Sequence, residues 1–408
     1  MTSRSTMHRG RILMLTAALV AMSSAMAAPA AEGVRPEVGK PLQDAQKALQ
    51  AKDYAAARDK LAAAEKVGSL TPYETYIINR LRAAVAASLG DAVTAVAAYE
   101  AALQAPQFPA DEKAATYEIV ARLSYAAKDY PKAARYLQQY RDAGGTTAAT
   151  LSLMPQALYL SGDIAAAQRE MLAQLAALEQ AGQAPTDLQL KLLASCAQKL
   201  QDDAGYVLAL EKLLRYHPDP AYWPDLLSRV RNQPGFSPRL MLDVYRLRAA
   251  SGTMADADDD IDAAQLALQA GYPGEADRYL RDGYARQRLG TGPDAARHQQ
   301  LRDLVARKLA DDQATLAEGD KAAASQATGD ALVSSGLNRI GYGQYEQGLQ
   351  LIQAGIAKGG LKKPDEARLH LGYAQLQAGR KTDAHATLAS VQGADGSAAL
   401  ARLYALLP

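Results

Sequence analysis

The residues of this chain that could perform catalysis or bind a metal are few and widely spaced. The five histidines are His8, His217, His298, His370 and His385. None has a second metal ligand four residues later, the spacing that lets one helix offer two ligands to zinc. The sequence also contains no Walker phosphate loop, no dinucleotide-binding fingerprint and no nucleophile elbow. These patterns predict a protein that is not an enzyme and that uses no metal or cofactor.

A dense acidic cluster is the strongest remaining candidate for a cation site. Its aspartates are Asp256, Asp258, Asp259, Asp260 and Asp262. The cluster lacks the central glycine and the terminal glutamate of a calcium-binding loop. It directly precedes an apolar stretch at residues 263–270, where carboxylates would face the positive end of a helix dipole. The favoured interpretation is therefore the start of a helix.

The charge and composition of the chain exclude two further classes of protein. Its 45 Lys and Arg residues nearly balance 44 Asp and Glu residues, and 49% of the chain is hydrophobic. A polybasic nucleic-acid binder needs an excess of cations, and a disordered chain needs low hydrophobicity with high net charge. The single cysteine, Cys196, lies in an apolar stretch at helical spacing, which predicts a buried thiol and no internal disulfide.

One short pattern recurs and predicts the elements of the fold. Aspartates at residues 53, 91, 129 and 163 are each followed four residues later by alanine, at intervals of 38, 38 and 34 residues. The aspartate suits the N-cap of a second helix, and the small residue lets two helices approach closely. Weaker copies occur near Asp203, Gly271, Gln344 and Gly379. Such a period predicts stacked helical hairpins and essentially no sheet.

The repeated turn resembles that of the tetratricopeptide repeat (TPR) family. Gly90-Asp91 with Ala95, Tyr99 and Ala102 reproduces the family's pattern, although its characteristic tryptophan is absent from every repeat. The resemblance implies an all-α, TPR-like superhelical solenoid that binds a protein or peptide in a groove lined by the first helix of each hairpin. Carrying over the groove-lining positions gives Arg80, Glu118, Arg122, Tyr125, Gln156 and Tyr159. Ordinary solvated or packing roles are the alternative for these six residues.

Prolines and aromatic residues concentrate in the least repeat-like part of the chain, residues 217–238. It contains the only tryptophan, Trp223, next to Tyr222. Proline at this density interrupts helices. One interpretation is a loop whose aromatic side chains plug the helical stack. The other is a partner-docking site, because Trp and Tyr are enriched at interface hot spots.

The N-terminal 27 residues have the pattern of a cleavable secretory signal. Three arginines precede an apolar run at residues 12–22, and Ala25-Met26-Ala27 has the form of a cleavage site. Its removal changes the formal charge from +1 to −2. The expected organisation is a signal at 1–27, a linker at 28–40, TPR-like repeats at 41–216, degenerate helical repeats with the proline and aromatic insertion at 217–330, and C-terminal repeats with a capping helix at 331–408.

Two short segments carry a narrower resemblance. Residues 38–42 and 222–229 resemble periplasmic repeat proteins that accompany TonB-type energy transduction. That resemblance implies a periplasmic adaptor beside a complex of ExbB, ExbD and TonB. The alternative is a structural accessory subunit of an outer-membrane assembly or secretion complex. No segment beyond the signal is apolar enough to suggest a membrane span.

Overall fold

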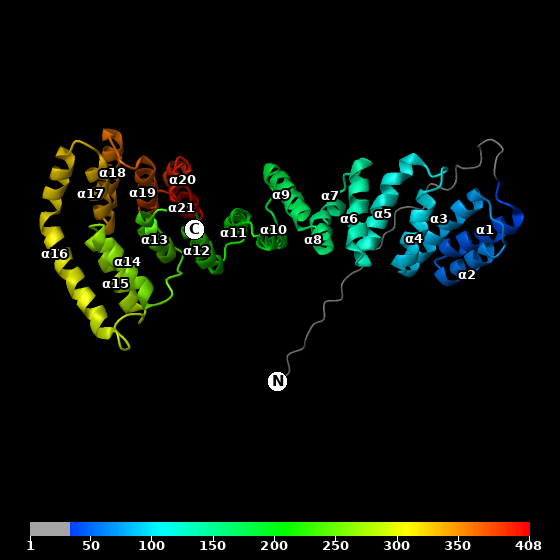
Figure 1. Ribbon diagram of the computed structural model, residues 1–408, viewed down its shortest axis with the longest axis horizontal. Helices are drawn as coiled ribbons and strands as arrows, with labels where there is room; N and C mark the ends of the chain where they lie inside the picture. The colour runs from blue at the N-terminus through cyan, green and yellow to red at the C-terminus, as the bar shows by residue number, and fades with distance from the viewer. Residues whose placement is uncertain (1–32) are drawn as a thin grey trace. The chain divides into compact units, whose positions relative to one another are not determined.

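The computed structural model describes residues 33–408, and these residues form 21 α-helices, three short 3-10 helices and no strand. The prediction of an all-α fold of helical hairpins is therefore confirmed. The predicted signal sequence and its cleavage site lie outside the described residues. The chain divides into two compact units, Met1–Gly162 (unit 1) and Asp163–Pro408 (unit 2) (Figure 1).

Unit 1 is a row of antiparallel helical hairpins. Its helices are α1 (Pro36–Gln50), α2 (Tyr54–Glu65), α3 (Pro72–Leu89), α4 (Ala92–Leu103), α5 (Lys113–Ala126), α6 (Tyr130–Asp142), α7 (Ala148–Leu151) and α8 (Met154–Ser161), with the 3-10 helix η1 (Ala110–Glu112) before α5. Helices α1 and α2, α3 and α4, and α5 and α6 pack as pairs, and each pair packs on the next. The predicted linker ends early, because α1 already begins at Pro36.

The repeated aspartates do what their spacing predicts. In unit 1 the side chains of Asp53, Asp91 and Asp129 accept hydrogen bonds of 3.0, 3.0 and 3.2 Å from backbone N–H groups three residues later. Asp163 begins α9 in unit 2 in the same way. The alanines four residues after these caps are 0% exposed. The local pattern therefore sets both the start of each second helix and its close contact with the first.

Unit 2 contains the remaining helices. They are α9 (Ile164–Gln180), α10 (Asp187–Leu200), α11 (Asp203–Tyr216), α12 (Trp223–Arg231), α13 (Met241–Ala250), α14 (Ala257–Gln269), α15 (Pro273–Ala285), α16 (Ala295–Ser325), α17 (Asp330–Gly341), α18 (Tyr345–Lys358), α19 (Pro364–Gln377), α20 (Lys381–Ala389) and α21 (Ser397–Tyr404), with the 3-10 helices η2 (Pro220–Tyr222) and η3 (Pro238–Leu240). The acidic cluster starts α14 as predicted, with Asp256 as its N-cap.

Two details of the repeat pattern in unit 2 differ from the prediction. The cap of α11 is Asp202 and not Asp203, which lies in the first turn. The weaker copies of the turn precede α15, α18 and α20, whose N-cap residues are Tyr272, Gln344 and Arg380. None of these side chains makes a capping hydrogen bond. These hairpins are therefore held by packing and not by the local cap.

The C-terminal hairpins of unit 2 fold back on its middle helices. Helix α21 contacts α13, and α15 contacts α17, so that α13 lies beside α19 and α21 (Figure 1). One hydrophobic cluster runs through this unit from Met171 to Tyr404. A solenoid in which each hairpin touches only its neighbours would lack these contacts. The contacts of η3 and α13 with α19 and α21 join residues more than 120 positions apart, as in the Arg239–Glu366 ion pair.

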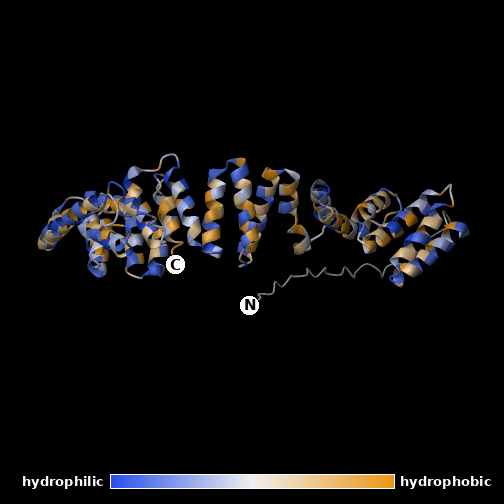
Figure 2. Ribbon diagram, turned by 90° about the horizontal axis from the view of Figure 1, so that it is seen from below, coloured by the Kyte–Doolittle hydropathy of each residue, from blue (hydrophilic) through white to orange (hydrophobic). Residues whose placement is uncertain are grey.

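Hydrophobic and hydrophilic residues are mixed along the helices of both units (Figure 2). Within the described part of the chain, no helix combines the length and the hydropathy that crossing a membrane would require.

Candidate functional site

Six predicted site residues occupy repeated positions of the first helices α3, α5 and α8 of unit 1, and these positions define what we call its first-helix face. Counted back from the aspartate of each turn, Arg80 and Glu118 are eleven residues upstream. Arg122 and Gln156 are seven residues upstream, and Tyr125 and Tyr159 are four. Equivalent positions of consecutive hairpins lie on the same face of the stack. All six side chains are half-buried, which leaves part of each one accessible.

Two of the six residues tie neighbouring elements together. The Arg80 guanidinium donates to Glu112, just before α5, at 2.5 Å and to the hydroxyl of Tyr76 at 3.0 Å. Glu118 accepts a 2.5 Å hydrogen bond from the hydroxyl of Thr150 in α7. Sequence reasoning predicted these residues as partner-binding, and the structure also gives them a role in holding successive hairpins in register.

Arg122 and Tyr125 have the greater capacity to bind a partner. The Arg122 side chain is 38% exposed, and its ion pair with Glu118 is long, at 3.9 Å. The ring of Tyr125 packs edge-on against Tyr130 with centroids 5.5 Å apart. Burial raises the pKa of Tyr125, so its hydroxyl remains protonated at neutral pH. The two side chains therefore offer hydrogen-bond donors to carbonyl or carboxylate oxygens.

The other two predicted residues, Tyr222 and Trp223, belong to unit 2. Trp223 is 4% exposed and packs in the main hydrophobic cluster, against which Tyr222 is partly buried. A side chain that is buried in this way does not offer its ring to a partner. The burial of Trp223 fits the first interpretation of this stretch, in which its aromatic side chains plug the helical stack.

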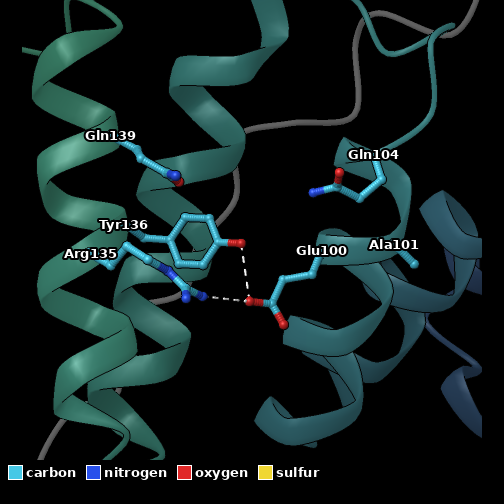
Figure 3. Close-up of a pocket in the computed structure, with 6 residues that line it drawn as sticks. All are labelled: Glu100, Ala101, Gln104, Arg135, Tyr136 and Gln139. Carbon is cyan, nitrogen blue, oxygen red and sulfur yellow. Dashed lines mark hydrogen bonds and ion pairs between the residues drawn. The ribbon is translucent and has the colours of Figure 1, made fainter.

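A hollow of about 450 Å³ lies between α4 and α6, which are the second helices of two neighbouring hairpins in unit 1. Arg135 and Tyr136 point from α6 toward Glu100 of α4 (Figure 3). Glu100 accepts hydrogen bonds from Lys132 at 3.0 Å and from Arg135 and Tyr136 at 3.1 Å. Burial, and then the charge of Glu100, raise the pKa of Tyr136 to about 12. The charged groups of this hollow therefore satisfy one another.

The same arrangement recurs in unit 2, which identifies it as structural. There Glu179 of α9 accepts from Lys212 at 2.5 Å and from Tyr216 at 3.1 Å, both in α11. The hydrogen bond from Lys212 is the main cause of the lowered pKa of Glu179. In both units the donors belong to the sequence K-x-x-R-Y, and the glutamate lies 32 or 33 residues before the lysine. This recurrence was a readable signal that sequence reasoning missed.

A buried ionic network in unit 2 was also not predicted. Arg246 of α13 donates to Glu275 of α15 at 2.8 and 2.7 Å and to Asp243 at 3.0 Å. All three side chains are 1% exposed. Burial opposes the ionisation of Glu275, but the charge and hydrogen bonds of Arg246, with the charge of Arg278 and the hydrogen bond from Tyr279, together outweigh it and lower the glutamate pKa. The paired charges therefore connect α13 and α15 within the hydrophobic cluster of unit 2.

Residues 33–408 meet neither the requirements of a metal site nor those of a reactive thiol. No group of three His, Cys, Asp or Glu side chains there is placed to hold a metal ion. Cys196 is buried in α10, as predicted, and burial raises the pKa of its thiol to about 11. At neutral pH this cysteine is therefore protonated and unreactive.

Comparisons with known proteins identify no family. No family model and no curated protein matches the chain. Among solved structures, Naa15/Naa10 bound to HypK-THB matches with 13% identity and a TM-score of 0.30. That match covers 89% of this chain and 58% of the other, so this chain spans little more than half of its length. Yeast Tom70 matches with 10% identity over 90% of this chain and 94% of the other, with a TM-score of 0.24. Both TM-scores are low, and the fold class rests on the helices and caps described above.

Proposed function

We propose that this protein is a non-catalytic helical-repeat scaffold that binds a protein or peptide partner through the first-helix face of unit 1. One observation carries this proposal. Equivalent positions of α5 and α8 present Arg122 with Gln156 and Tyr125 with Tyr159, all of them half-buried on one face. A row of polar and aromatic side chains at the repeat spacing suits an extended or helical segment that runs across several hairpins.

The chemistry of the face favours a partner that offers hydrogen-bond acceptors. Arg122 makes only a long ion pair at 3.9 Å, and the Tyr125 hydroxyl stays protonated. Hydrogen bonds from arginine to carboxylates are charge-assisted and are about twice as strong as neutral ones. The partner is therefore a segment with backbone carbonyls or acidic side chains facing α5.

The cellular setting of the proposal is the bacterial envelope. Its support is the signal-like pattern of residues 1–27 and the resemblance of residues 38–42 and 222–229 to periplasmic repeat proteins of TonB-type systems. Val38 is 0% exposed and Trp223 is 4% exposed. Because these side chains are buried, the resemblance concerns residues that pack inside the fold and not residues that could contact a partner. On this proposal the chain is a periplasmic adaptor beside a complex of ExbB, ExbD and TonB.

The proposal is tested by capturing the partner in cells. A tagged chain is crosslinked in vivo, and the attached proteins are identified by quantitative mass spectrometry. The double variant Arg122→Ala/Tyr125→Ala should lose the captured partner at least tenfold while its far-UV circular dichroism stays unchanged. The matched control Tyr54→Ala/Arg58→Ala removes the same two residue types from α2 and should retain the partner.

The identity of the captured protein separates the two envelope functions. Inner-membrane energy-transduction subunits would support the adaptor. Outer-membrane assembly or secretion components would favour a structural accessory subunit. Equal capture by the wild type and by the Arg122/Tyr125 variant would remove the first-helix face of unit 1 as the binding surface.

A further inference from the structure

The proline and aromatic stretch of unit 2 continues into a segment that lies along the C-terminal hairpins like a bound peptide. This internal segment comprises residues 236–250 and includes η3 and α13. Its backbone N–H at Ser237 donates to the carbonyl of Asp395 at 2.8 Å. The ring of Phe236 lies against Gly396, where a Cβ would collide with it. Gly396 also has φ +102°, so this position requires glycine for its backbone as well.

Charged anchors follow at regular intervals along the internal segment. Arg239 donates to Glu366 of α19 and to Asp395, both at 3.2 Å. Asp243 lies 3.1 Å from His370 of α19 and accepts from the hydroxyl of Tyr404 in α21 at 3.2 Å. The order of anchors is therefore an aromatic residue, an arginine and an aspartate.

A second arginine completes the order of anchors. The guanidinium carbon of Arg246 lies 4.5 Å from the ring centroid of Tyr373 in α19. This distance is within the range of a cation–π interaction, which strengthens when water is excluded. Tyr373 in turn packs against Tyr404, with ring centroids 5.7 Å apart. The full pattern is Phe-x-x-Arg-x-x-x-Asp-x-x-Arg, which contacts α19, α21 and the turn before α21, while Glu275 of α15 also pairs with Arg246.

The surface that holds this pattern is the first-helix face of α19. Counted back from the start of α20 at Arg380, Glu366 is fourteen residues upstream and Tyr373 is seven. Tyr373 therefore occupies the position of Arg122 and Gln156 in unit 1. In unit 1 that position is half-buried, whereas Tyr373 is 3% exposed because the internal segment, α15 and α21 all contact it.

We propose that the first-helix face of α19, together with α21, is a second peptide-binding surface, which the chain occupies with its own residues 236–250. Helix α21 acts as the latch, because Arg402 fastens it to Glu211 of α11 while Tyr404 holds Asp243 of the internal segment. The kind of partner it fits is a protein segment with the same order of aromatic, arginine, aspartate and arginine anchors. This inference concerns unit 2 and is independent of the function proposed for unit 1.

The test uses the full chain and a fluorescent synthetic peptide of residues 234–250. The latch variant Arg402→Ala removes the ion pair of α21 with Glu211 and leaves Tyr404, which holds Asp243, in place. It should bind the peptide at least threefold more tightly than the wild type. The control Arg380→Ala removes a half-exposed arginine that pairs with Glu346, and it should bind as the wild type does.

A second variant covers the case in which the latch variant fails to fold. Phe236→Ala/Arg239→Ala weakens the internal segment at its accessible end and leaves the buried network around Arg246 intact. It should also bind the peptide at least tenfold more tightly, and hydrogen exchange should rise in residues 236–250 but not in α5 and α6. A peptide with Phe236, Arg239 and Asp243 replaced by alanine should not bind.

Three results would overturn the proposal. The first is that folded variants bind the peptide no better than the wild type does. The second is that the alanine-substituted peptide binds as well as the native one. The third is that hydrogen exchange rises throughout unit 2 at once, because the internal segment would then be an inseparable part of the core.

Discussion

Units 1 and 2 use the same helical hairpin but treat its first-helix face in opposite ways. In unit 1 the face of α5 carries Arg122, whose side chain is 38% exposed. In unit 2 the equivalent position of α19 is Tyr373, which is 3% exposed because α13, α15 and α21 all contact it. The hairpin itself therefore does not decide whether its first-helix face is accessible. The deciding factor is whether another part of the chain returns to cover the face.

The two units also differ in how far their ion pairs are exposed to solvent. Unit 1 holds its hairpins together with half-exposed pairs such as Arg80–Glu112. Such pairs are screened by solvent and contribute little to stability. Unit 2 buries Arg246 with Glu275 and Asp243, and removing one partner there leaves an uncompensated charge out of water. We therefore expect mutations of equal chemistry to have unequal effects in the two units.

The largest expected effect is in the buried network. Glu275→Ala leaves the guanidinium of Arg246 without its main partner and should destabilise unit 2 by about 3–5 kcal/mol. The measurement is urea unfolding followed by the fluorescence of Trp223, the single tryptophan, which is buried in unit 2. Glu112→Ala in unit 1 is the comparison, followed by circular dichroism because the single tryptophan lies in unit 2, and it should cost less than about 1 kcal/mol. Equal costs would remove the distinction between the two units.

Overpacking of a hairpin should have the next largest effect. Ala133 is 0% exposed where α6 meets α5, so Ala133→Leu forces extra volume into a filled space. It should cost about 1–3 kcal/mol in unit 1, measured by circular dichroism, with the Trp223 signal unchanged. Ala97→Leu, at an exposed position of α4, is the control and should leave the melting curve unchanged. An unchanged melt for Ala133→Leu would mean that the alanine does not set the helix contact.

Removal of a cap should have a smaller effect and again separate the units. Asp129→Ala leaves the N–H of Lys132 without its acceptor and should cost about 1 kcal/mol. Gln344→Ala, at the start of α18, removes a side chain that makes no capping bond, and it should change stability by less than about 0.5 kcal/mol. A larger loss at Gln344 than at Asp129 would contradict the assignment of the caps.

The pH dependence of unit 1 should be the most modest effect. The hydrogen bond from Arg35 is the main cause that lowers the pKa of Glu74 from 4.5 to about 2. The folded state therefore gains stability from this carboxylate above pH 4.5 and loses it as the pH falls toward 2. Glu74→Gln should flatten the acid side of the unfolding midpoint measured by circular dichroism. A variant with the same acid dependence as the wild type would exclude Glu74 as its source.

The parts of the fold that were predictable from the sequence are those set by local interactions. Asp53, Asp91 and Asp129 act within three residues of themselves, so their role as caps can be read from spacing alone. The burial of Ala133 follows from the same local geometry. The cap of α11 was misplaced by one residue, because Asp202 and Asp203 are adjacent and both suit a helix start.

The fold-back of unit 2 was not predictable from a repeat period. The contact between Asp243 and His370 joins residues 127 positions apart, and the bond from Tyr404 to Asp243 spans 161. Nothing in the local pattern around His370 distinguishes a surface histidine from a partner of a buried aspartate. Whether a candidate site residue is accessible depends on such contacts, which is why Trp223 was open to two interpretations until its burial was known.

The most direct test of partner binding at the first-helix face of unit 1 is site-specific photocrosslinking in cells. A photoreactive amino acid replaces Tyr125 on the first-helix face of unit 1 or, as a matched control, Gln138 on the exposed side of α6. The account predicts a covalent adduct with one discrete protein at position 125 and none at position 138. An adduct of equal yield at both positions, or no adduct at position 125, would contradict the claim that this face binds the partner.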